Sequence, residues 1–522
     1  MNKWRIFSVA AAAAMLLTGC AKIEQDTMPE LIAATETTPL VPVATATEQP
    51  SHESVALQVP EITREEADIT LEAEDVSIPT GCSVSIVPRL GYSGTGYLSG
   101  LNAENGSTLE LEADIPATQH YDITVVLGAD TPSTCRILAN GEPVYTLKAE
   151  ENENFVRATV QGIFLSKGKC KLEIEPVSGI VDIDCVELVN NTSLYDEDAA
   201  IAQTPVNPHA SASAKALLKF LADSYGRKIV TGQYVSDSTN KELEQIYQVT
   251  GAYPLIRFAD MQNYSRNGGN AAQATAVEDS LAWAQEGGIA GLSWYWNAPA
   301  GNASIYAKDT TFDLSAAVTD KDIATATDAQ LSQMAASGEI SEGCYAMIQD
   351  IDAVSEQLKK LADADVPVLW RPLMEAGGDW FWWGASGADA YRWLWELMYT
   401  RMTEYHQLNN LLWIWNGQSS SYQVDKSQYD IASLDVYVKD KTEAYGSRYE
   451  QYVALRNMTG GKLLALSECS TVPDMNAMFR DNAVWSFFGL WYAPYLGEYT
   501  SNDALLSVYH SEGALVRGDY QP

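Results

Sequence analysis

VPVLWRPLMEAGGDWFWWG, residues 366–384, joins a mostly apolar run to a polar and aromatic ending. The run from Val366 to Met374 presents apolar side chains to both faces of an extended chain, with Arg371 as the exception. Strands of a parallel sheet that is covered by helices on both sides have this pattern. Glu375 ends the run, so the stretch predicts a buried parallel strand with an acidic residue at its carboxyl end.

The same pattern continues on both sides of this stretch. Other apolar runs lie between residues 228 and 492, and helix-like segments such as 352–364 and 389–407 lie between them. Doubly wound sheets also alternate strands with helices, but no Gly-rich phosphate-binding turn follows any of these runs. Residues 205–522 therefore predict an α/β fold, a (β/α)8 TIM barrel. The expected strands are KIVTGQYV (228–235), PLIRFADM (254–261), GIAGLSWYWN (288–297), VPVLWRPLME (366–375), LLWIWN (411–416), IASLDVY (431–437), KLLALSE (462–468) and WSFFGLWY (485–492).

An all-β unit precedes the barrel. Short runs alternate apolar and polar residues from Asp68 to Val189, and turn signals separate them at intervals of about 8–12 residues. This spacing is typical of a β-sandwich, so we predict a sandwich module over residues 67–190. Its strands are expected in ITLEAEDVSI (69–78), STLELEADI (107–115), YDITVVLGA (121–129), CRILANGEPVYTL (135–147), KCKLEIEPV (169–177) and IVDIDCVELV (180–189).

The first 20 residues have the pattern of a secretory signal. Lys3 and Arg5 precede an apolar run from Ile6 to Leu17, and LTGC at 17–20 resembles a bacterial lipobox. We expect Cys20 to be the lipidated first residue of the mature protein; the alternative is an ordinary signal peptide with a chance cysteine. Residues 21–66 are rich in Thr, Pro and Glu and predict a disordered tether. The protein is therefore expected outside the cytoplasm, as a bacterial lipoprotein anchored to a membrane or the cell surface.

The charge balance narrows the class of partner. The chain has 69 acidic and 33 basic residues and a formal net charge of −36. Nucleic-acid binding is excluded because phosphate contacts need a basic surface. An anionic polysaccharide is disfavoured for the same electrostatic reason, whereas a neutral glycan is compatible. We expect a monomer.

Six cysteines lie outside the signal peptide, and none has the spacing of zinc ligands. An extracellular setting permits disulfides, and four cysteines in the module would allow three pairings. Buried free thiols are the alternative, and we favour them. The six are Cys82, Cys135, Cys170, Cys185, Cys344 and Cys469.

Four acidic residues end predicted strands of the barrel: Asp260, Glu375, Asp435 and Glu468. Acids at strand ends often only cap the next helix, but the active site of such a barrel also lies at these ends. Cleavage of a glycosidic bond needs two carboxyl groups. Thirteen of the 14 tryptophans lie in the barrel region, many of them near strand ends. We interpret this group as platforms for sugar rings in preference to core packing alone.

Seven stretches of the barrel region occur in the order of one known family. They are GQYV (232–235), SWYWNAP (293–299), RPLMEAGGDWFWWG (371–384), YRWLWELM (391–398), NLLWIWN (410–416), LDVY (434–437) and LALSE (464–468). Together they make residues 205–522 resemble glycoside hydrolase family 26, whose best-known members are endo-β-1,4-mannanases.

The resemblance implies a role for each matching residue. Glu375 would be the general acid/base, Glu468 the nucleophile and Tyr437 the hydrogen-bond donor to that nucleophile, with net retention of configuration. This chemistry requires Glu375 to be protonated at rest and Glu468 to be ionised, and it needs no cofactor. The substrate-binding residues would be Trp294, Tyr295, Trp296, Asn297, Arg371, Met374, Trp380, Trp383 and Trp415.

Two positions depart from the family. The family usually has histidine where this chain has Met374 and Tyr295, and both positions lie beside the scissile bond. A plant-type mannan is the favoured substrate. The same mechanism on another β-glycan, such as mixed-linkage β-glucan or β-1,3-xylan, is one alternative, and a glycan-capturing lipoprotein without catalysis is another.

The sandwich resembles carbohydrate-binding modules of family 35 in LEAE (71–74), GYSGTGYL (91–98) and VDIDCVEL (181–188). By that resemblance Glu72, Glu74 and Asp184 would hold a structural calcium ion through oxygen ligands; the alternative is that they are solvated strand residues. The module has no tryptophan, so a stacking platform would use tyrosines, and the module acts only as a spacer if it has none. The candidate tyrosines are Tyr92, Tyr97 and Tyr121.

Overall fold

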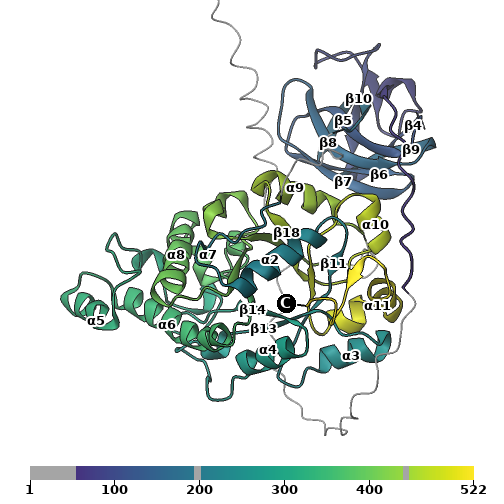
Figure 1. Ribbon diagram of the computed structural model, residues 1–522. Helices are drawn as coiled ribbons and strands as arrows, with labels where there is room; N and C mark the ends of the chain where they lie inside the picture. The colour runs from purple at the N-terminus through teal and green to yellow at the C-terminus, as the bar shows by residue number, and fades with distance from the viewer. Residues whose placement is uncertain (1–53, 193–200, 439–445, 522) are drawn as a thin grey trace, which may run out of the picture.

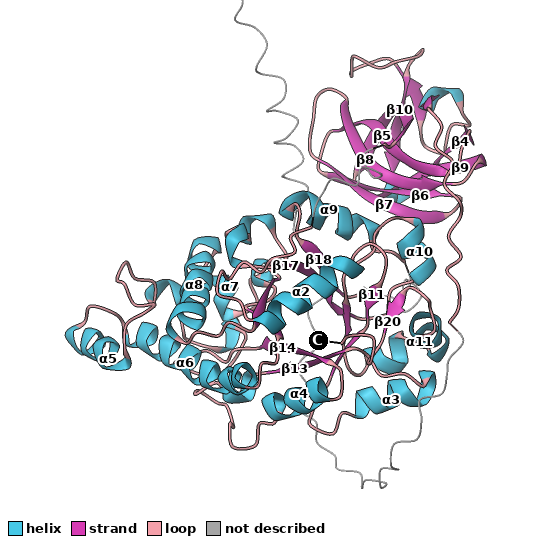
Figure 2. Ribbon diagram, viewed as in Figure 1, coloured by secondary structure: helices cyan, strands magenta, loops and turns pink. Residues whose placement is uncertain are grey.

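The computed structural model describes residues 54–192, 201–438 and 446–521. Within them lie a β-rich module and a larger body in which helices surround a barrel of strands (Figures 1 and 2). The expected signal peptide, Cys20 and residues 21–53 of the expected tether lie outside the described residues. None of the described helices is both long and apolar enough to span a bilayer.

The module is a sandwich of two antiparallel sheets, as predicted. Along one strand, Leu109–Ile115, the side chains alternate between the core and solvent, so that the leucines are buried while Glu110 and Glu112 are exposed. One sheet contains β2 (Ser83–Ser85), β3 (Tyr97–Asn102), β10 (Ile180–Asn190), β5 (Gln119–Ala129) and β8 (Val156–Leu165), with β1 (Asp68–Glu72) also paired to β10. The other contains β4 (Leu109–Ile115), β9 (Gly168–Ser178), β6 (Ser133–Ala139) and β7 (Glu142–Ala149).

The larger body is a closed barrel of eight parallel strands, which confirms the predicted fold. Each predicted strand contributes one barrel strand; most are shorter than the predicted run, whereas β18 extends one residue beyond its run, to Cys469. In order around the barrel they are β12 (Gly232–Tyr234), β13 (Ile256–Asp260), β14 (Ile289–Trp294), β15 (Val368–Pro372), β16 (Leu411–Trp415), β17 (Ile431–Val436), β18 (Leu463–Cys469) and β19 (Phe488–Leu490). A short parallel pair, β11 (Ile229–Val230) and β20 (Ala514–Leu515), lies outside this barrel.

Helices cover the outside of the barrel (Figure 2). The longest, α6, begins after Ser341, whose hydroxyl accepts the Cys344 N–H at 3.1 Å and caps the helix. Apolar residues three or four apart face the barrel: Met347, Ile351, Val354, Leu358 and Leu361. The main helices are α2 (Ala212–Ser224), α3 (Lys241–Thr250), α4 (Ala276–Gln285), α5 (Asp328–Ser337), α6 (Glu342–Asp363), α7 (Trp382–Ala385), α8 (Ala388–Thr400), α9 (Tyr449–Thr459), α10 (Met475–Arg480) and α11 (Asn502–Tyr509).

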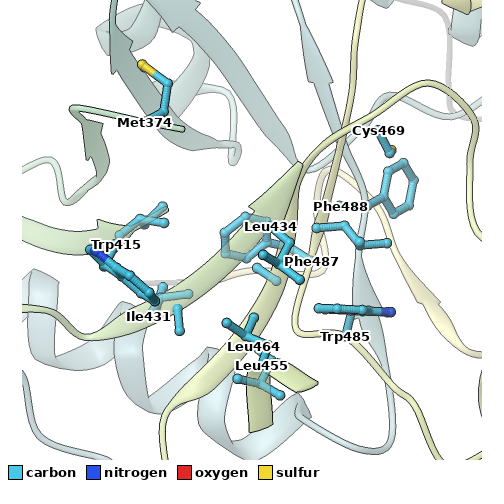
Figure 3. Close-up of a cluster of buried hydrophobic side chains, with 14 of the residues drawn as sticks. Met374, Trp415, Ile431, Leu434, Leu455, Leu464, Cys469, Trp485, Phe487 and Phe488 are labelled. Atoms are coloured by element: carbon cyan, nitrogen blue, oxygen red, sulfur yellow. The ribbon is translucent and has the colours of Figure 1, made fainter. Parts of the chain in front are cut away.

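Large side chains fill the space around the strands β17, β18 and β19. Figure 3 shows Trp415, Ile431, Leu434, Phe487 and Phe488 among this packed group. Every one of these residues is buried. The barrel is therefore a packed core, and only the ends of its strands are free to carry chemistry.

Residues 55–63 form a strap that runs from the barrel to the module (Figure 1). The Val55 N–H donates to the His510 carbonyl at 2.6 Å, the Gln58 N–H donates to Asn476 Oδ1 at 2.8 Å, and the Thr63 N–H donates to a module carbonyl at 2.9 Å. The prediction of a tether up to residue 66 is therefore wrong for this strap. Backbone hydrogen bonds hold the strap on the barrel and the module, and a polar composition does not reveal such hydrogen bonds.

The module packs on the barrel through β7 and the helices α9 and α10. The Tyr449 hydroxyl donates to the Gln161 carbonyl, and His120 Nε2 lies 3.0 Å from the Arg480 carbonyl oxygen. The Arg480 guanidinium also lies over the Phe164 ring. The six cysteines of the module and barrel are free, as favoured from the sequence.

Candidate active site

The turn after β15 sets the position of Glu375. β15 ends at Pro372, and Leu373 and Glu375 then adopt left-handed backbone conformations, each with φ of 53°. Residues other than glycine stay in this region only where surrounding contacts hold them. The Glu375 N–H donates to the Asn416 carbonyl at 2.7 Å, which ties the turn to the residue that follows β16. The acid is thus held at the carboxyl end of the barrel.

Glu468 lies near the end of β18 and accepts three charged or phenolic hydrogen bonds. Arg371 Nη1 donates to Oε1 at 2.6 Å, and the Tyr295 hydroxyl donates to the same oxygen at 2.5 Å. The Tyr437 hydroxyl donates to Oε2 at 2.6 Å. The structure therefore brings Tyr437 onto Glu468, and it adds Tyr295 and Arg371 as two further donors. These three donors fix the orientation of the Glu468 carboxyl group, as a positioned nucleophile requires.

Arg371 is fully buried beneath the acids. It forms ion pairs with Asp435 and Glu468, and it also donates to the Tyr234 hydroxyl at 3.2 Å. Burial opposes its charge, but the carboxylates of Asp435 and Glu468 outweigh burial and raise the pKa of Arg371 well above its ordinary value. The guanidinium is thus a permanent cation whose contacts are all to the protein. Its Nε is buried without a hydrogen bond to the described residues, and the role of Arg371 in sugar binding stays a prediction.

Glu375 is fully buried, and its surroundings differ from those of Glu468. Burial, followed by the negative charges of Asp435 and Glu468, raises its pKa well above the ordinary value of a glutamate. Gln418 Nε2 donates to Oε1 at 3.1 Å, and Trp380 Nε1 donates to Oε2 at 3.2 Å. These surroundings favour the protonated form of Glu375, the form that a general acid requires.

Asp435, at the end of β17, links the two glutamates. Its side chain is hydrogen-bonded to Glu375 and accepts the Ser467 hydroxyl at 2.7 Å, while it pairs with Arg371. Burial raises the pKa of Asp435 to about 7, although Arg371 opposes this shift. Sequence reasoning marked Asp435 only as an acid at a strand end. The structure makes it the nearest negative charge to the proton of Glu375.

Asn416 was missed by the sequence reasoning and connects the same groups. Its Oδ1 accepts from Arg371 Nη2 at 3.1 Å and from the Glu375 N–H at 3.2 Å. Its Nδ2 donates to the Ser467 hydroxyl at 3.0 Å and to the Ser433 carbonyl. The available signal was a single amide at the end of the otherwise apolar run LLWIWN.

Comparison with known proteins assigns both parts of the chain to families. Residues 206–518 match the model of glycosyl hydrolase family 26, and residues 69–190 match that of carbohydrate binding module family 35. The chain belongs to glycosyl hydrolase family 26. This family 26 enzyme is a glycoside hydrolase, and its family assignment agrees with the resemblance seen in its motifs.

Several known proteins are similar to the family 26 enzyme over both its module and its barrel. It is 32% identical to a mannan endo-1,4-beta-mannosidase of Thermothelomyces thermophilus over 87% of this chain and 90% of that protein. It is 30% identical to mannan endo-1,4-beta-mannosidase B of Piromyces sp over 86% of this chain and 77% of the relative. The crystal structure of a Podospora anserina GH26-CBM35 β-(1,4)-mannanase has a TM-score of 0.59 and 29% identity, and the match covers 88% of this chain and 99% of that chain.

Four tryptophans expected to bind sugar are packed inside the family 26 enzyme. Trp294 and Trp296 stack with ring centroids 4.1 Å apart, Trp383 donates its Nε1–H to the Met374 carbonyl at 2.8 Å, and Trp415 packs on a tyrosine ring. All four, and Met374, are fully buried. Other protein groups cover these five residues, as they also cover Glu375 and Glu468, so their role in sugar binding stays a prediction. Sequence alone did not reveal which face of a strand each ring occupies.

Trp380, Tyr295 and Asn297 lie closer to the chemistry. Trp380 is half-buried and contacts Glu375, whereas Tyr295 is buried on Glu468. Asn297 is 7% exposed, and its amide group is held by Gln262 and by a backbone carbonyl. Trp380 is therefore the predicted tryptophan that remains open to a sugar.

The module of the family 26 enzyme brings together two of the three predicted calcium ligands. Glu72, Asp184 and Cys185 place ligand atoms within 4.8 Å of one another, and the Ser93 hydroxyl donates to Glu72 at 2.7 Å. Glu74 instead accepts two backbone N–H groups of the loop at 95–96, and its Oε2 is buried without a hydrogen bond. Burial raises the pKa of Cys185 to about 12, so its thiol is neutral. The oxygen ligands fit a hard cation, and the thiol does not.

The tyrosines of the module differ in exposure. Tyr97 and Tyr121 are fully buried, and the Tyr121 hydroxyl donates to a carbonyl inside the module. They offer no face to a sugar. Tyr92 is half-buried, and of these three tyrosines it alone can serve as a stacking surface.

Proposed function

We propose that this enzyme is an endo-β-1,4-mannanase that acts by double displacement with net retention. The different surroundings of the two glutamates carry the mechanism, because burial and neighbouring carboxylates raise the pKa of Glu375, while Glu468 accepts three hydrogen bonds that orient it. The substrate comes from the relatives, several of which are mannan endo-1,4-beta-mannosidases and span most of this chain. Glycosidases with this pair of carboxyl groups need no metal or redox group for the reaction.

In the first step a Glu468 oxygen attacks the anomeric carbon and forms a glycosyl ester. The bond from that carbon to the leaving oxygen breaks, and the Glu375 proton passes to this oxygen. The departure of the proton leaves Glu375 as a carboxylate beside Asp435. Arg371 compensates the negative charge that accumulates among these acids.

In the second step Glu375 acts as a base. It takes a proton from water, the water oxygen bonds to the anomeric carbon, and the ester bond to Glu468 breaks. Two inversions at the same carbon restore the β configuration. The raised pKa of Glu375 suits both steps, since the group must give a proton and regain it.

Access to the carboxyl groups requires movement of a covering side chain. Both glutamates are fully buried, while Trp380 on Glu375 is half-buried. We infer that the sugar meets the Trp380 ring first and displaces it from Glu375. An aromatic ring at this position also suits the apolar face of a sugar.

A panel of soluble polysaccharides tests the proposal. Wild-type enzyme is expected to release reducing ends from β-mannan, with oligosaccharides of mixed length as products, and none from mixed-linkage β-glucan or β-1,3-xylan. Cleavage of either of these glycans without cleavage of mannan would assign a different substrate. Binding of mannan that Glu468→Ala leaves intact, with no hydrolysis by the wild type, would favour glycan capture.

The identity of residue 374 favours a β-glycan other than mannan as a second candidate substrate. Met374 is fully buried and apolar at a position where the family usually has a polar histidine, so it cannot donate a hydrogen bond to a sugar hydroxyl. The panel therefore includes glycans that differ from mannan at the hydroxyl positions of the sugar ring.

We also propose that Cys20 carries a lipid anchor that places the enzyme outside the cytoplasm. The support is the LTGC stretch after a charged and apolar leader. Metabolic labelling with a radioactive fatty acid is expected to mark the wild type and not Cys20→Ala. Equal labelling of both would contradict the anchor.

Finally, we propose that Glu72 and Asp184 hold a calcium ion in the module. Among the described residues, Oε2 of Glu74 is buried and accepts no hydrogen bond, and burial and neighbouring carboxylates raise the pKa of Glu72; both observations fit a site for a cation. Both proteins are first treated with a chelator. Addition of calcium is then expected to raise the unfolding temperature of the wild type and to leave the unfolding temperature of Asp184→Asn unchanged. An equal response of both proteins, or none, would contradict this proposal.

A further inference from the structure

Tyr295 contacts the nucleophile directly, although it was expected to contact the sugar. Its hydroxyl donates to Glu468 Oε1 at 2.5 Å, which is as short as the contacts of Arg371 and Tyr437 with the same carboxylate. The burial of Tyr295 and the charge of Glu468 raise the pKa of the phenol well above its ordinary value. The hydroxyl therefore remains a donor over the whole working range of pH.

The two oxygens of Glu468 are occupied unequally. An ionised carboxylate oxygen accepts about two hydrogen bonds in its plane. Within residues 54–192, 201–438 and 446–521, Oε1 accepts from both Tyr295 and Arg371, whereas Oε2 accepts from Tyr437 alone. Only Oε2 then keeps a lone pair that can attack a carbon atom.

The Tyr295 side chain is held from several sides. Its backbone N–H donates to Asp260 Oδ1 at 3.0 Å, and its ring makes edge contacts with Phe381 and Trp491 at centroid distances of 6.0 Å and 5.8 Å. The same ring lines a cavity of about 470 Å³ between the ends of β12, β13 and β19. Tyr295 thus lines this cavity and contacts Glu468, in an orientation that contacts within the protein fix before substrate binds.

We propose that Tyr295 is a positioning residue that, together with Arg371, saturates Oε1 of Glu468 and so makes Oε2 the attacking oxygen. The glycosyl ester then forms through Oε2, and the Glu375 proton goes to the leaving oxygen as described above. This inference rests on the proposed double displacement. It assigns to the tyrosine a role in the orientation of the carboxylate and not in sugar recognition.

Tyr295→Phe is the sharpest variant, because it keeps the ring that lines the cavity and removes only the hydroxyl. A hydrogen bond to a charged group supports a loss of about 10- to 100-fold in kcat, with KM for a manno-oligosaccharide within about twofold of the wild type. Tyr253→Phe is a matched control, since that hydroxyl donates to the exposed Glu244 at 2.9 Å on the outside of the barrel. A kcat within twofold of the wild type, or a rise in KM at unchanged kcat, would overturn the proposal.

A trapped glycosyl ester gives the second readout. A 2-deoxy-2-fluoro glycosyl fluoride is used to trap the wild type, and a crystal structure of the product is expected to show the ester on the oxygen next to Tyr437. An ester on the oxygen that faces Tyr295 and Arg371 would contradict the inference.

The substrate and the inference can fail separately. If the wild type cleaves another β-glycan in place of mannan, the proposed substrate fails, and the kcat ratio is measured on that glycan. If the wild type cleaves no glycan, crystal structures of the wild type and Tyr295→Phe still test whether Tyr295 orients the Glu468 carboxylate. The Glu468 carboxylate is expected to rotate in the variant, and an unchanged carboxylate plane would overturn the positioning role.

Discussion

At the scale of single residues, the four charged side chains of the site form one electrostatic unit. Arg371 is a single buried cation among Glu375, Asp435 and Glu468, so one of the three acids keeps a proton to limit the negative charge. Burial raises the pKa of Glu375 most, and the two neighbouring carboxylates add to that effect. The surroundings of Glu375, and not a property of glutamate itself, therefore favour its protonated form.

The variant Asp435→Asn tests whether the charge of Asp435 raises the pKa of Glu375. An ionised Asp435 disfavours the ionisation of Glu375, so its replacement by a neutral group of the same shape lowers the pKa of Glu375. The alkaline limb of kcat/KM against pH is expected to move to lower pH, with a loss of about 10-fold or more near neutral pH. An alkaline limb that stays in place would contradict the role of Asp435.

Asn416→Ala tests the amide that connects the turn to the site. The change leaves the Ser467 hydroxyl and the Arg371 guanidinium without one partner each. Loss of such buried partners costs about 1–3 kcal/mol in the free energy of unfolding. Chemical denaturation and kcat measure the two effects, and we expect both to fall. Loss of stability with unchanged kcat would mean that Asn416 supports only the fold.

At the scale of elements, the apolar runs predicted every barrel strand because each strand is covered on both faces. The strand ends were less predictable. Leu373 and Glu375 take left-handed conformations, and the Glu375 N–H is held by Asn416, which lies in another part of the sequence. The tryptophans show the same limit, since a run such as LLWIWN does not say which ring points into the core.

The strap at residues 55–63 is an element that composition failed to reveal. Its Leu57 N–H donates to Glu512 Oε1 at 3.0 Å. Glu512→Ala is expected to speed proteolytic cleavage within the strap about 3- to 10-fold, as the loss of one hydrogen bond implies, at unchanged kcat. The exposed Glu404, on the π-helical turn after α8, provides a control alanine variant. Equal cleavage rates in both variants would show that the strap is not held by this contact.

At the scale of the whole molecule, the barrel buries several acids with raised pKa values. Burial raises the pKa of Asp260, Asp435 and Glu450 to about 7, and that of Asp350 and Asp430 to about 6. These acids bind protons more tightly in the folded chain than in the unfolded chain, so folding is favoured as pH falls toward their unfolded values. The net charge of −36 acts in the same direction, because protonation reduces self-repulsion.

The unfolding temperature is therefore expected to rise as pH falls from 8 to 5. Differential scanning calorimetry across this range measures it. Asp430→Asn is expected to flatten the profile partly, since its two backbone donors then meet a neutral side chain. A maximum of stability at pH 8 or above would contradict this reading of the buried acids.

The two-part architecture could be predicted from sequence, and so could the position of Glu375 and Glu468 at the carboxyl end of the barrel, whereas the contacts between the parts could not. Tyr449 and His120 meet backbone groups of the opposite part, and such pairings leave no trace in local patterns. Asp435 and Tyr295 were visible as strand-end residues. Their contacts with Glu375 and Glu468 depend on how neighbouring strands align at the carboxyl end of the barrel.

The stereochemistry of the reaction tests the central claim most directly. Proton NMR during hydrolysis of a manno-oligosaccharide follows the anomeric signal of the newly formed reducing end before mutarotation. Double displacement through Glu468 and Glu375 predicts that the β-anomer appears first. Initial release of the α-anomer would show inversion and would contradict the assignment of Glu468 as the nucleophile.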